Sequence, residues 1–120
     1  MVSVAVVLGG IVIGTAGSSD AELKGSGKYT TLCVSCHGPA GDGNWPAAAA
    51  LNPNPRNLTD GKYMNARTDA QLINVIKNGG TAEKLSPMMM AFGNQLNDSE
   101  IKDIAAYIRS LAVPKYQPKK

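Results

Sequence analysis

The two cysteines and the single histidine of this chain lie within five residues, as Cys33-Val-Ser-Cys36-His37, so the fold has to be built around this short segment. A structural zinc site needs four ligands, usually in two pairs, and this segment offers three at most. A dithiol redox site of thioredoxin type follows a strand of a βαβ unit. The residues before Cys33, GSGKYTT, do not form an apolar strand pattern.

Covalent attachment of haem matches the segment better than either alternative. In that chemistry two thiols add to the vinyl groups of the porphyrin, and the histidine that follows becomes a ligand of the iron. Two cysteines and one histidine are all that it requires, and they are all that the chain has. A disulfide or two free thiols would leave the adjacent histidine without a role. We therefore predict one haem c attached through Cys33 and Cys36, with His37 as an iron ligand.

The N-terminal segment indicates where in the cell the protein is located. Residues 1–19 contain no charge, and their apolar centre spans 4–13. This length is typical of a signal peptide and short for a bilayer span, which needs about 20 residues. No Lys or Arg precedes the apolar run, so a retained, short membrane anchor is the alternative. Because haem is attached outside the cytoplasm, we expect residues 1–20 to direct the protein to the periplasm or another extracytoplasmic space, with membrane contact only if residues 1–19 are retained.

The rest of the chain is predicted to form one small domain, 21–113, and a basic, disordered tail, 114–120. A core of this size buries only about 60–65% of the surface of the unfolded chain, and a covalently bound porphyrin would supply the missing apolar centre. Residues 20–113 hold nine basic and nine acidic residues, so the formal charge of +3 comes from three tail lysines. No basic patch with interleaved aromatic residues is present, which argues against nucleic-acid binding.

The apolar pattern predicts an all-α fold, with three main helices and no strand. The first helix is expected over 21–36, ending at a run of glycines. Residues 44–61 contain three prolines and predict a loop, with one short turn at 47–50.

Two further helices have clear start signals. One begins after Thr68, whose capping-box partner is Gln71, and ends at two consecutive glycines. The other begins at Asn97 or Asp98, with a glutamate three residues after Asn97. Its apolar stripe is Ile101, Ile104, Ala105, Ile108 and Leu111.

The iron needs a second axial ligand or keeps an open site, and no second histidine exists to fill it. Methionine thioether is the soft ligand available. The candidates are Met64 and the run 88–90, which lies in the loop before the last helix. Methionine is also a flexible filler of protein cores. If none of the run reaches the iron, the alternative is a ligand-binding haem protein.

With these features in place, residues 22–112 resemble a class I cytochrome c, the small monohaem electron carrier of bacteria. Three segments carry the resemblance: GSGKYTTLCVSCHG, GDGNWPAAAALNPNPRNLTD and MMMAFGNQLNDSEIKDIAAYIRSL. It implies three main helices and loops wrapped around one haem. In the family the axial methionine usually lies three positions before an aromatic residue, and counting back from Phe92 selects Met89, with Met88 as second choice.

The resemblance also implies further contacts of the haem site. A proline carbonyl of the loop normally accepts a hydrogen bond from the second ring nitrogen of the histidine, and Pro53 is the first choice for it, Pro55 the second. Arg56 matches a position that often meets a haem propionate. Trp45 stands where many relatives have glycine, and it could cover the haem edge or donate a hydrogen bond to a propionate.

The family packs a small residue of the first helix against an aromatic residue of the last. Gly25 and Tyr107 match these positions, and Tyr29 could join them. An iron capped by histidine and methionine has no free position, so we expect no enzyme activity. The implied function is one-electron transfer between an extracytoplasmic oxidoreductase and an acceptor complex, by a monomer with transient redox partners. The alternative is a haem subunit bound permanently to a membrane respiratory enzyme.

Overall fold

The computed structural model describes residues 5, 9, 10 and 17–118. Within these residues the regular structure is helical, apart from one isolated bridge between Asp60 and Val113, and the predicted all-α class is confirmed. Most of the predicted signal peptide or anchor, residues 1–20, lies outside the described residues, as do the last two residues of the tail. The elements are α1 (Asp20–Leu32), α2 (Val34–His37), η1 (Pro46–Ala50), α3 (Gly61–Met64), α4 (Asp69–Asn78), η2 (Gly80–Glu83) and α5 (Asp98–Leu111).

The first predicted helix is present but divided. It begins with a capping box between Ser19 and Glu22, and α1 ends at Leu32. Cys33 interrupts the helix, α2 follows, and Gly38 ends it with a positive φ of 78°, a conformation that glycine adopts without strain. The interruption separates a long helix from the single turn that holds Cys36 and His37.

The other start signals are confirmed. Thr68 and Gln71 form the predicted capping box of α4. Asn97, rather than Asp98, caps α5, and Glu100 bonds back to it. The short turn predicted at 47–50 is η1. The short elements α3 and η2 were not predicted, because a single turn is too short to show an apolar period.

The core forms where α1 crosses α5, the helix pair with the most extensive packing. A side chain at Gly25 would overlap the carbonyl oxygen of Asp103 in α5, so glycine lets the two backbones meet. Close by, the rings of Tyr29 and Tyr107 pack with centroids 5.1 Å apart. The Tyr29 hydroxyl donates to the carbonyl oxygen of Gly38, 2.7 Å away. The crossing thereby ties α1 and α5 to the turn that follows α2.

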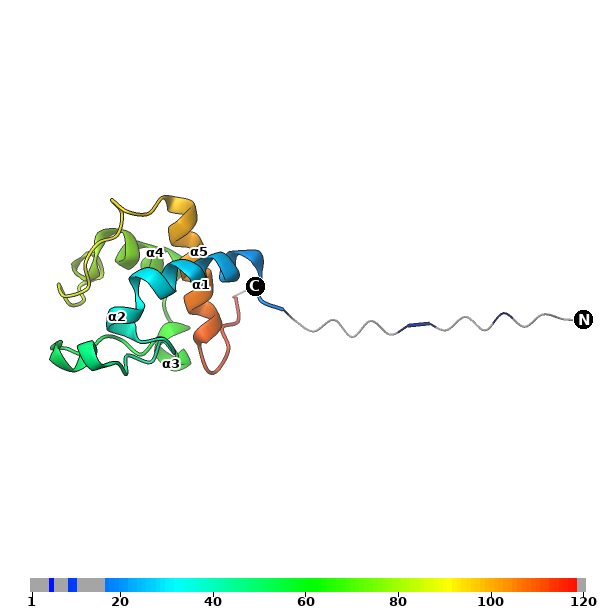
Figure 1. Cartoon of the computed structure of the whole chain (residues 1–120), viewed down its shortest axis with the longest axis horizontal. Helices are drawn as coiled ribbons and strands as arrows, with labels where there is room; N and C mark the ends of the chain where they lie inside the picture. Colours follow the sequence, from blue (N-terminus) through cyan, green and yellow to red (C-terminus); the bar gives the residue numbers. More distant parts are fainter. Residues whose placement is uncertain (1–4, 6–8, 11–16, 119–120) are drawn as a thin grey trace, which may run out of the picture.

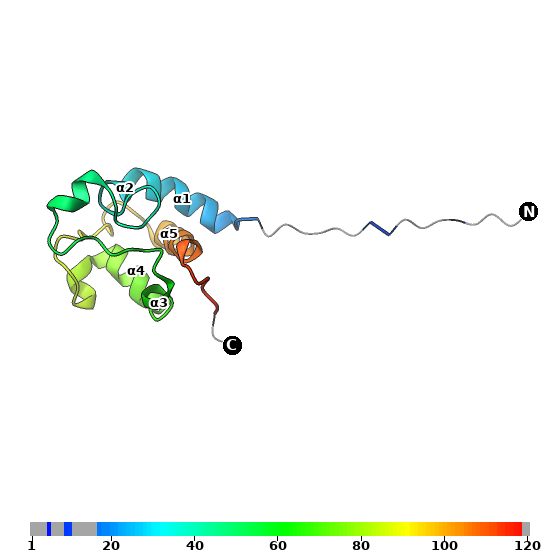
Figure 2. The same ribbon diagram turned by 90° about the horizontal axis from the view of Figure 1, so that it is seen from below.

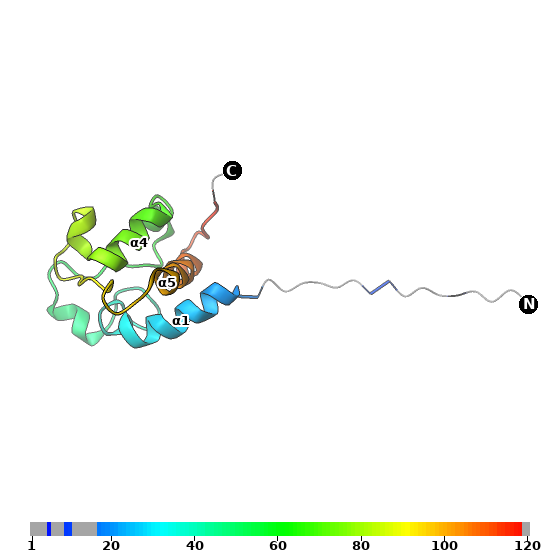
Figure 3. The same cartoon turned by 90° about the horizontal axis from the view of Figure 1, so that it is seen from above.

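The helices are arranged around α5. It lies between α1 and α4 in two opposite views (Figures 2 and 3). The start of α1 and the end of the described chain lie at one end of the domain. The α2–η1 segment and the loop after η2 lie at the other end, on different sides of it (Figure 1). These two segments supply walls of the cavity described next.

Candidate functional site

A cavity of about 970 Å³ lies at the loop end of the domain. Its lining is mostly apolar and includes side chains of the helical core, such as Ile104 and Ile108. Both cysteines and the histidine line it from the α2 side, and Met64 and Met88–Met90 also line it. The fold thus brings every predicted iron ligand to one apolar cavity.

We call residues 33–43 the proximal segment. Its backbone is fixed by short-range hydrogen bonds: the N–H of Cys33 donates to Tyr29 (2.8 Å), and the N–H of Gly43 donates to His37 (2.8 Å). Cys33 and Cys36 are partly buried free thiols, three residues apart on a helical turn. Burial, with a smaller contribution from Cys36, raises the pKa of the Cys33 thiol to about 11. A dithiol redox centre needs a lowered thiol pKa, so the thioredoxin-like alternative is not supported.

His37 is held in a metal-binding form. Its Nδ1 lies 3.2 Å from the carbonyl oxygen of Arg56; a carbonyl only accepts, so Nδ1 carries the proton and the lone pair is on Nε2. Burial lowers the pKa of His37, against a smaller opposing effect of this hydrogen bond. The predictions that Pro53 or Pro55 supplies this carbonyl are therefore wrong. The carbonyl oxygen of Pro55 is directed at Gly43, where a side-chain carbon would lie 2.8 Å from it, and the next carbonyl faces the histidine. Pro53 still lines the cavity.

We call residues 79–93 the distal loop. Its three methionines differ in burial: Met88 is 53% and Met90 62% exposed, whereas Met89 is partly buried and packs on the core. The backbone here turns instead of being extended, because the N–H of Met88 donates to the Ser86 hydroxyl (3.1 Å) and that of Met89 to the Ser86 carbonyl (3.3 Å). The N–H of Gly80 donates to the carbonyl of Met89 (2.9 Å).

Of the two remaining predicted haem contacts, Arg56 lines the cavity and Trp45 does not. Arg56 lines the cavity, with its guanidinium carbon 3.8 Å from the ring centroid of Tyr63. Trp45 is 42% exposed and is not part of the lining. It directly precedes η1, whereas the residues of this loop that line the cavity are 51 and 53–58. The sequence analysis missed Arg67, which also lines the cavity and lies over Tyr63 at 4.9 Å.

These residues fit a haem. The cavity offers an apolar enclosure, two thiols on one turn, a neutral imidazole and a thioether. Two arginines, Arg56 and Arg67, also line it, and their positive charge is compatible with the carboxylates of a haem. Over the same residues no group of three His, Cys, Asp or Glu side chains is arranged to hold a metal ion, so the zinc alternative has no support there. No described helix has the length and apolar character needed to span a membrane.

Sequence comparison gives a family and several relatives. Residues 23–112 match the family described as cytochrome c. The chain is 30% identical over 95 residues to the cbb3-type cytochrome c oxidase subunit FixP of Azorhizobium caulinodans, covering 79% of this chain and 29% of that protein. It is 34% identical over 88 residues to FixP of Bradyrhizobium diazoefficiens, covering 73% and 27%. The cbb3-type subunit CcoP of Azospirillum brasilense is 29% identical over 96 residues, covering 78% and 30%. The matched part is thus less than a third of each relative.

Solved structures share the fold. The KustC0563 c-type cytochrome aligns with a TM-score of 0.60 and 24% identity, over 73% of this chain and 96% of that one. Cytochrome CL of Methylophaga aminisulfidivorans aligns with a TM-score of 0.59 and 27% identity, over 78% and 55%. Together with the geometry of the cavity, these findings show that the chain belongs to the cytochrome c family, as a class I-like monohaem member that carries a covalently bound haem c and takes part in electron transfer.

Proposed function

We propose that this protein is a one-electron carrier whose haem iron is held between His37 and Met89. The haem, when bound, supplies a one-electron redox couple. His37 and Met89 would together hold the iron and would leave no position open to substrate, and the lining of the cavity keeps the site in an apolar enclosure. A thioether ligand favours the reduced iron and raises the reduction potential.

The observation that carries this proposal is the burial of Met89 between two exposed methionines. A ligand in the cavity has to be reached from a side chain that points inward, and of the three consecutive methionines Met89 is the one packed on the core. The register counted from Phe92 selects the same residue. Met64, which is buried and also lines the cavity, is the remaining candidate.

Three alanine variants test the proposal. Met89→Ala is expected to abolish the weak far-red charge-transfer band of iron(III)–thioether ligation, to lower the reduction potential, and to let the reduced protein bind carbon monoxide. Met88→Ala and Met90→Ala are the matched controls and should keep the band. If Met88→Ala loses the band and Met89→Ala keeps it, the register is off by one; if all three keep it, Met64 becomes the candidate. Rapid binding of carbon monoxide by the unmodified protein would instead indicate a ligand-binding haem protein.

We propose further that the carrier works outside the cytoplasm, between an oxidoreductase and an acceptor complex, and that residues 1–20 are a signal peptide. The uncharged apolar stretch 4–13 and the small residues that follow it support this interpretation. Intact-mass measurement of the native protein decides it. A mass that fits a start between residues 17 and 22 plus one haem supports cleavage, whereas a mass that includes Met1 supports an anchor.

A second candidate is a haem domain bound permanently to a respiratory oxidase. It is favoured by the relatives, all three of which are named as subunits of cbb3-type cytochrome c oxidases. Mild detergent extraction of membranes followed by size separation distinguishes the two. A free carrier should elute at the size of the single chain with its haem, and a subunit should elute with a larger complex.

A further inference from the structure

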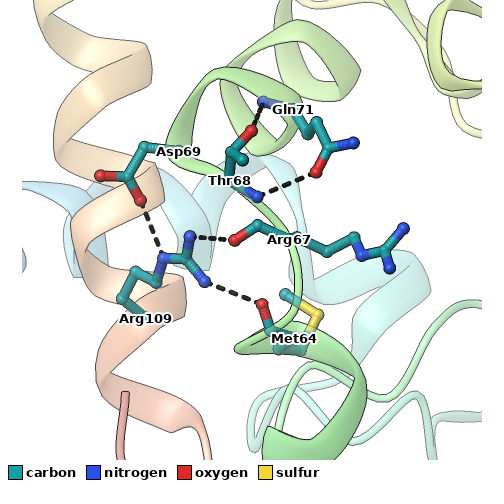
Figure 4. A network of polar contacts seen from close by, with 6 residues as sticks. All are labelled: Met64, Arg67, Thr68, Asp69, Gln71 and Arg109. Carbon is teal, nitrogen blue, oxygen red and sulfur yellow. Dashed lines mark hydrogen bonds and ion pairs between the residues drawn. The ribbon is translucent and has the colours of Figure 1, made fainter. Parts of the chain in front are cut away.

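The methionines of the described chain form a series of decreasing exposure. Met90 is 62% and Met88 is 53% exposed, Met89 is partly buried, and Met64 is 3% exposed. The carbonyl oxygen of Met64 also accepts from Nη1 of Arg109 (2.8 Å), which ties the turn that carries Met64 to α5 (Figure 4). Met64 is therefore a buried reference with which the two exposed thioethers can be compared.

The turn in the distal loop fixes the backbone on both sides of Met89. The N–H of Met89 donates to the carbonyl oxygen of Ser86 (3.3 Å), and the carbonyl oxygen of Met89 accepts from the N–H of Gly80 (2.9 Å). The N–H of Met88 donates to the Ser86 hydroxyl (3.1 Å). The exposure of Met88 and Met90 is therefore a property of this hydrogen-bonded turn, because an exchange of the buried and exposed side chains would break these contacts.

The two exposed methionines do not serve as core residues in the described chain. Met89 packs on the hydrophobic core, whereas Met88 and Met90 are not among the side chains that do so. Both also border the cavity, at the end of the domain where the loop after η2 lies (Figure 1). A haem in the cavity can cover only the side of each thioether that faces it, and each residue is more than half exposed. The usual role of methionine as a flexible filler of cores therefore does not account for this pair.

An exposed thioether readily accepts one oxygen atom. The reaction converts methionine to its sulfoxide, and methionine sulfoxide reductases reverse it. The core around Met64 keeps an oxidant away from its sulfur. Met89 is screened by its packing, and the lone pair of its sulfur is engaged when it binds the iron. Met88 and Met90 have neither form of protection.

We propose that Met88 and Met90 are sites of reversible oxygen transfer, which consume two-electron oxidants before these react with Met89. With a hypohalous acid as the oxidant, an S–O bond forms and the O–halogen bond breaks. The sulfur is oxidised by two electrons, the halogen is reduced to halide, and the proton is released to the solvent. Each of the two side chains accepts one oxygen atom, and the ligands of the iron do not change.

The consequence is that the distal loop carries two kinds of redox site. Met89 belongs to the iron centre, which exchanges one electron, and the flanking methionines accept oxygen atoms. The protection of the iron centre rests on the proposed ligation by Met89. The order in which the methionines are oxidised rests on their exposure alone.

The experiment is a titration of the holoprotein, with its iron oxidised, with hypochlorite. Tandem mass spectrometry of the tryptic peptides 85–102 and 63–67 locates each added oxygen atom. The first two molar equivalents, roughly one for each exposed thioether, should be found on Met88 and Met90, with Met89 and Met64 unmodified and the far-red band intact. Oxygen on Met89 or Met64 at the same doses, or loss of the band in step with the first oxygen atoms, would overturn the proposal.

The double variant Met88→Leu/Met90→Leu tests the protection of the iron centre. Leucine has a similar volume and is apolar, but it has no sulfur. The hypochlorite dose that removes half of the far-red band should fall by about two molar equivalents relative to the wild type. Coincident titration curves would contradict the proposal.

A matched control adds one thioether elsewhere in the double variant. Leu23 of α1 is 63% exposed and does not line the cavity, so Leu23→Met restores an accessible sulfur without touching the distal loop. It should recover about one molar equivalent of the lost dose. No recovery would mean that the double variant loses its band through a change in the loop, which counts against the proposal.

Reversal completes the test. Methionine sulfoxide reductases of both stereochemical classes should remove the added oxygen from the native protein, because both sites are exposed; sulfoxide that persists at either site would contradict reversibility. Failure of the proposed function is visible separately. If Met89→Ala keeps the far-red band, Met89 is not the ligand, whereas the order of oxidation of Met88 and Met90 is unaffected by that result.

Discussion

The proximal segment, 33–43, and the distal loop, 79–93, both line the cavity, but they are held in different ways. The bonds within the proximal segment are short in sequence, such as those from Gly38 to Val34 and from Gly43 to His37, and the N–H of Leu58 adds a bond to the carbonyl oxygen of Gly41 (2.7 Å). The distal loop is held mainly at its two ends. The N–H groups of Phe92 and Gly93 donate to the carbonyls of Ile76 and Lys77 at the end of α4, each over 2.9 Å, and Gly80 donates to Met89.

The distal loop also exposes more apolar side-chain surface than the proximal segment does. Leu85, Met88 and Met90 of the distal loop are large apolar side chains that are 42–62% exposed. The proximal segment is anchored to the core by Tyr29, which is almost fully buried and bonds to Gly38. A loop with exposed backbone and few buried contacts opens at a lower free energy than a segment packed on the core. We therefore expect the distal side of the site to open first.

The largest effect should come from the proximal side. His37→Ala removes the imidazole whose Nδ1 is oriented by the Arg56 carbonyl, and no second histidine exists to replace it. The six-coordinate low-spin spectrum should be lost completely. The haem should stay on the polypeptide in acidic acetone, because both thiols remain.

Ser35→Ala is the control for this variant, since Ser35 lies exposed between the two cysteines. Its spectrum should equal that of the wild type. A low-spin spectrum retained in His37→Ala would mean that a residue other than His37 binds the iron from the proximal segment or from elsewhere.

This difference also decides what could be predicted from the sequence. The proximal motif and the capping boxes of α4 and α5 are local patterns, so the residues themselves are enough to predict the local structure. The carbonyl that orients His37 was assigned wrongly, because it depends on how the loop 53–57 passes Gly43. Arg67 was missed for a similar reason: it lines the cavity, and its carbonyl is held by Arg109, which is 42 residues away in the sequence.

The burial of the three methionines shows a second limit of prediction from the sequence. In an extended chain, consecutive side chains such as those of Met88, Met89 and Met90 point to alternate sides. The alternation is present, but it arises from a turn organised by Ser86. The register counted from Phe92 thus selects the partly buried residue although the backbone is a turn, because local hydrogen bonds to Ser86 decide between an extended loop and a turn.

The second largest effect is expected in the distal loop, from Gly80→Ala. A side-chain carbon at Gly80 would overlap the carbonyl oxygen of Ser86 and would lie 3.2 Å from Cβ of Met89. The loop has to move away, at a cost of about 2–3 kcal/mol in the free energy of unfolding. Because Met89 moves with it, the far-red band should weaken and carbon monoxide should bind faster to the reduced protein.

Gly27→Ala provides the matched control for this substitution. Nothing lies within 4 Å of the added carbon, and alanine in a helix is favoured over glycine by about 0.5–1 kcal/mol. The band should be unchanged and the stability slightly higher. An unchanged band in Gly80→Ala, at lowered stability, would show that the position of Met89 does not depend on Gly80.

A smaller effect is expected from the equivalent change on the proximal side, Gly43→Ala. Gly43 has a φ of 77°, and a side-chain carbon there would lie 2.8 Å from the carbonyl oxygen of Pro55. The left-handed conformation alone should cost about 1–2 kcal/mol, measurable by denaturant unfolding. The far-red band should persist, because His37 is tethered through its neighbour Cys36. Loss of the band here would contradict the idea that the proximal side is the more rigid one.

The smallest effect separates the two segments most cleanly, because it removes one side-chain hydrogen bond from each. Ser86 accepts from the N–H of Met88 (3.1 Å) in the distal loop, and Asp42 accepts from the N–H of Asn44 (2.9 Å) at the end of the proximal segment. Ser86→Ala and Asp42→Ala should each lower the free energy of unfolding by only about 0.5–1 kcal/mol. Yet only the distal change weakens the loop that holds Met89, so the rate of carbon monoxide binding to the reduced protein should rise in Ser86→Ala and stay constant in Asp42→Ala. Equal rates in the two variants would mean that opening of the site is not confined to the distal loop.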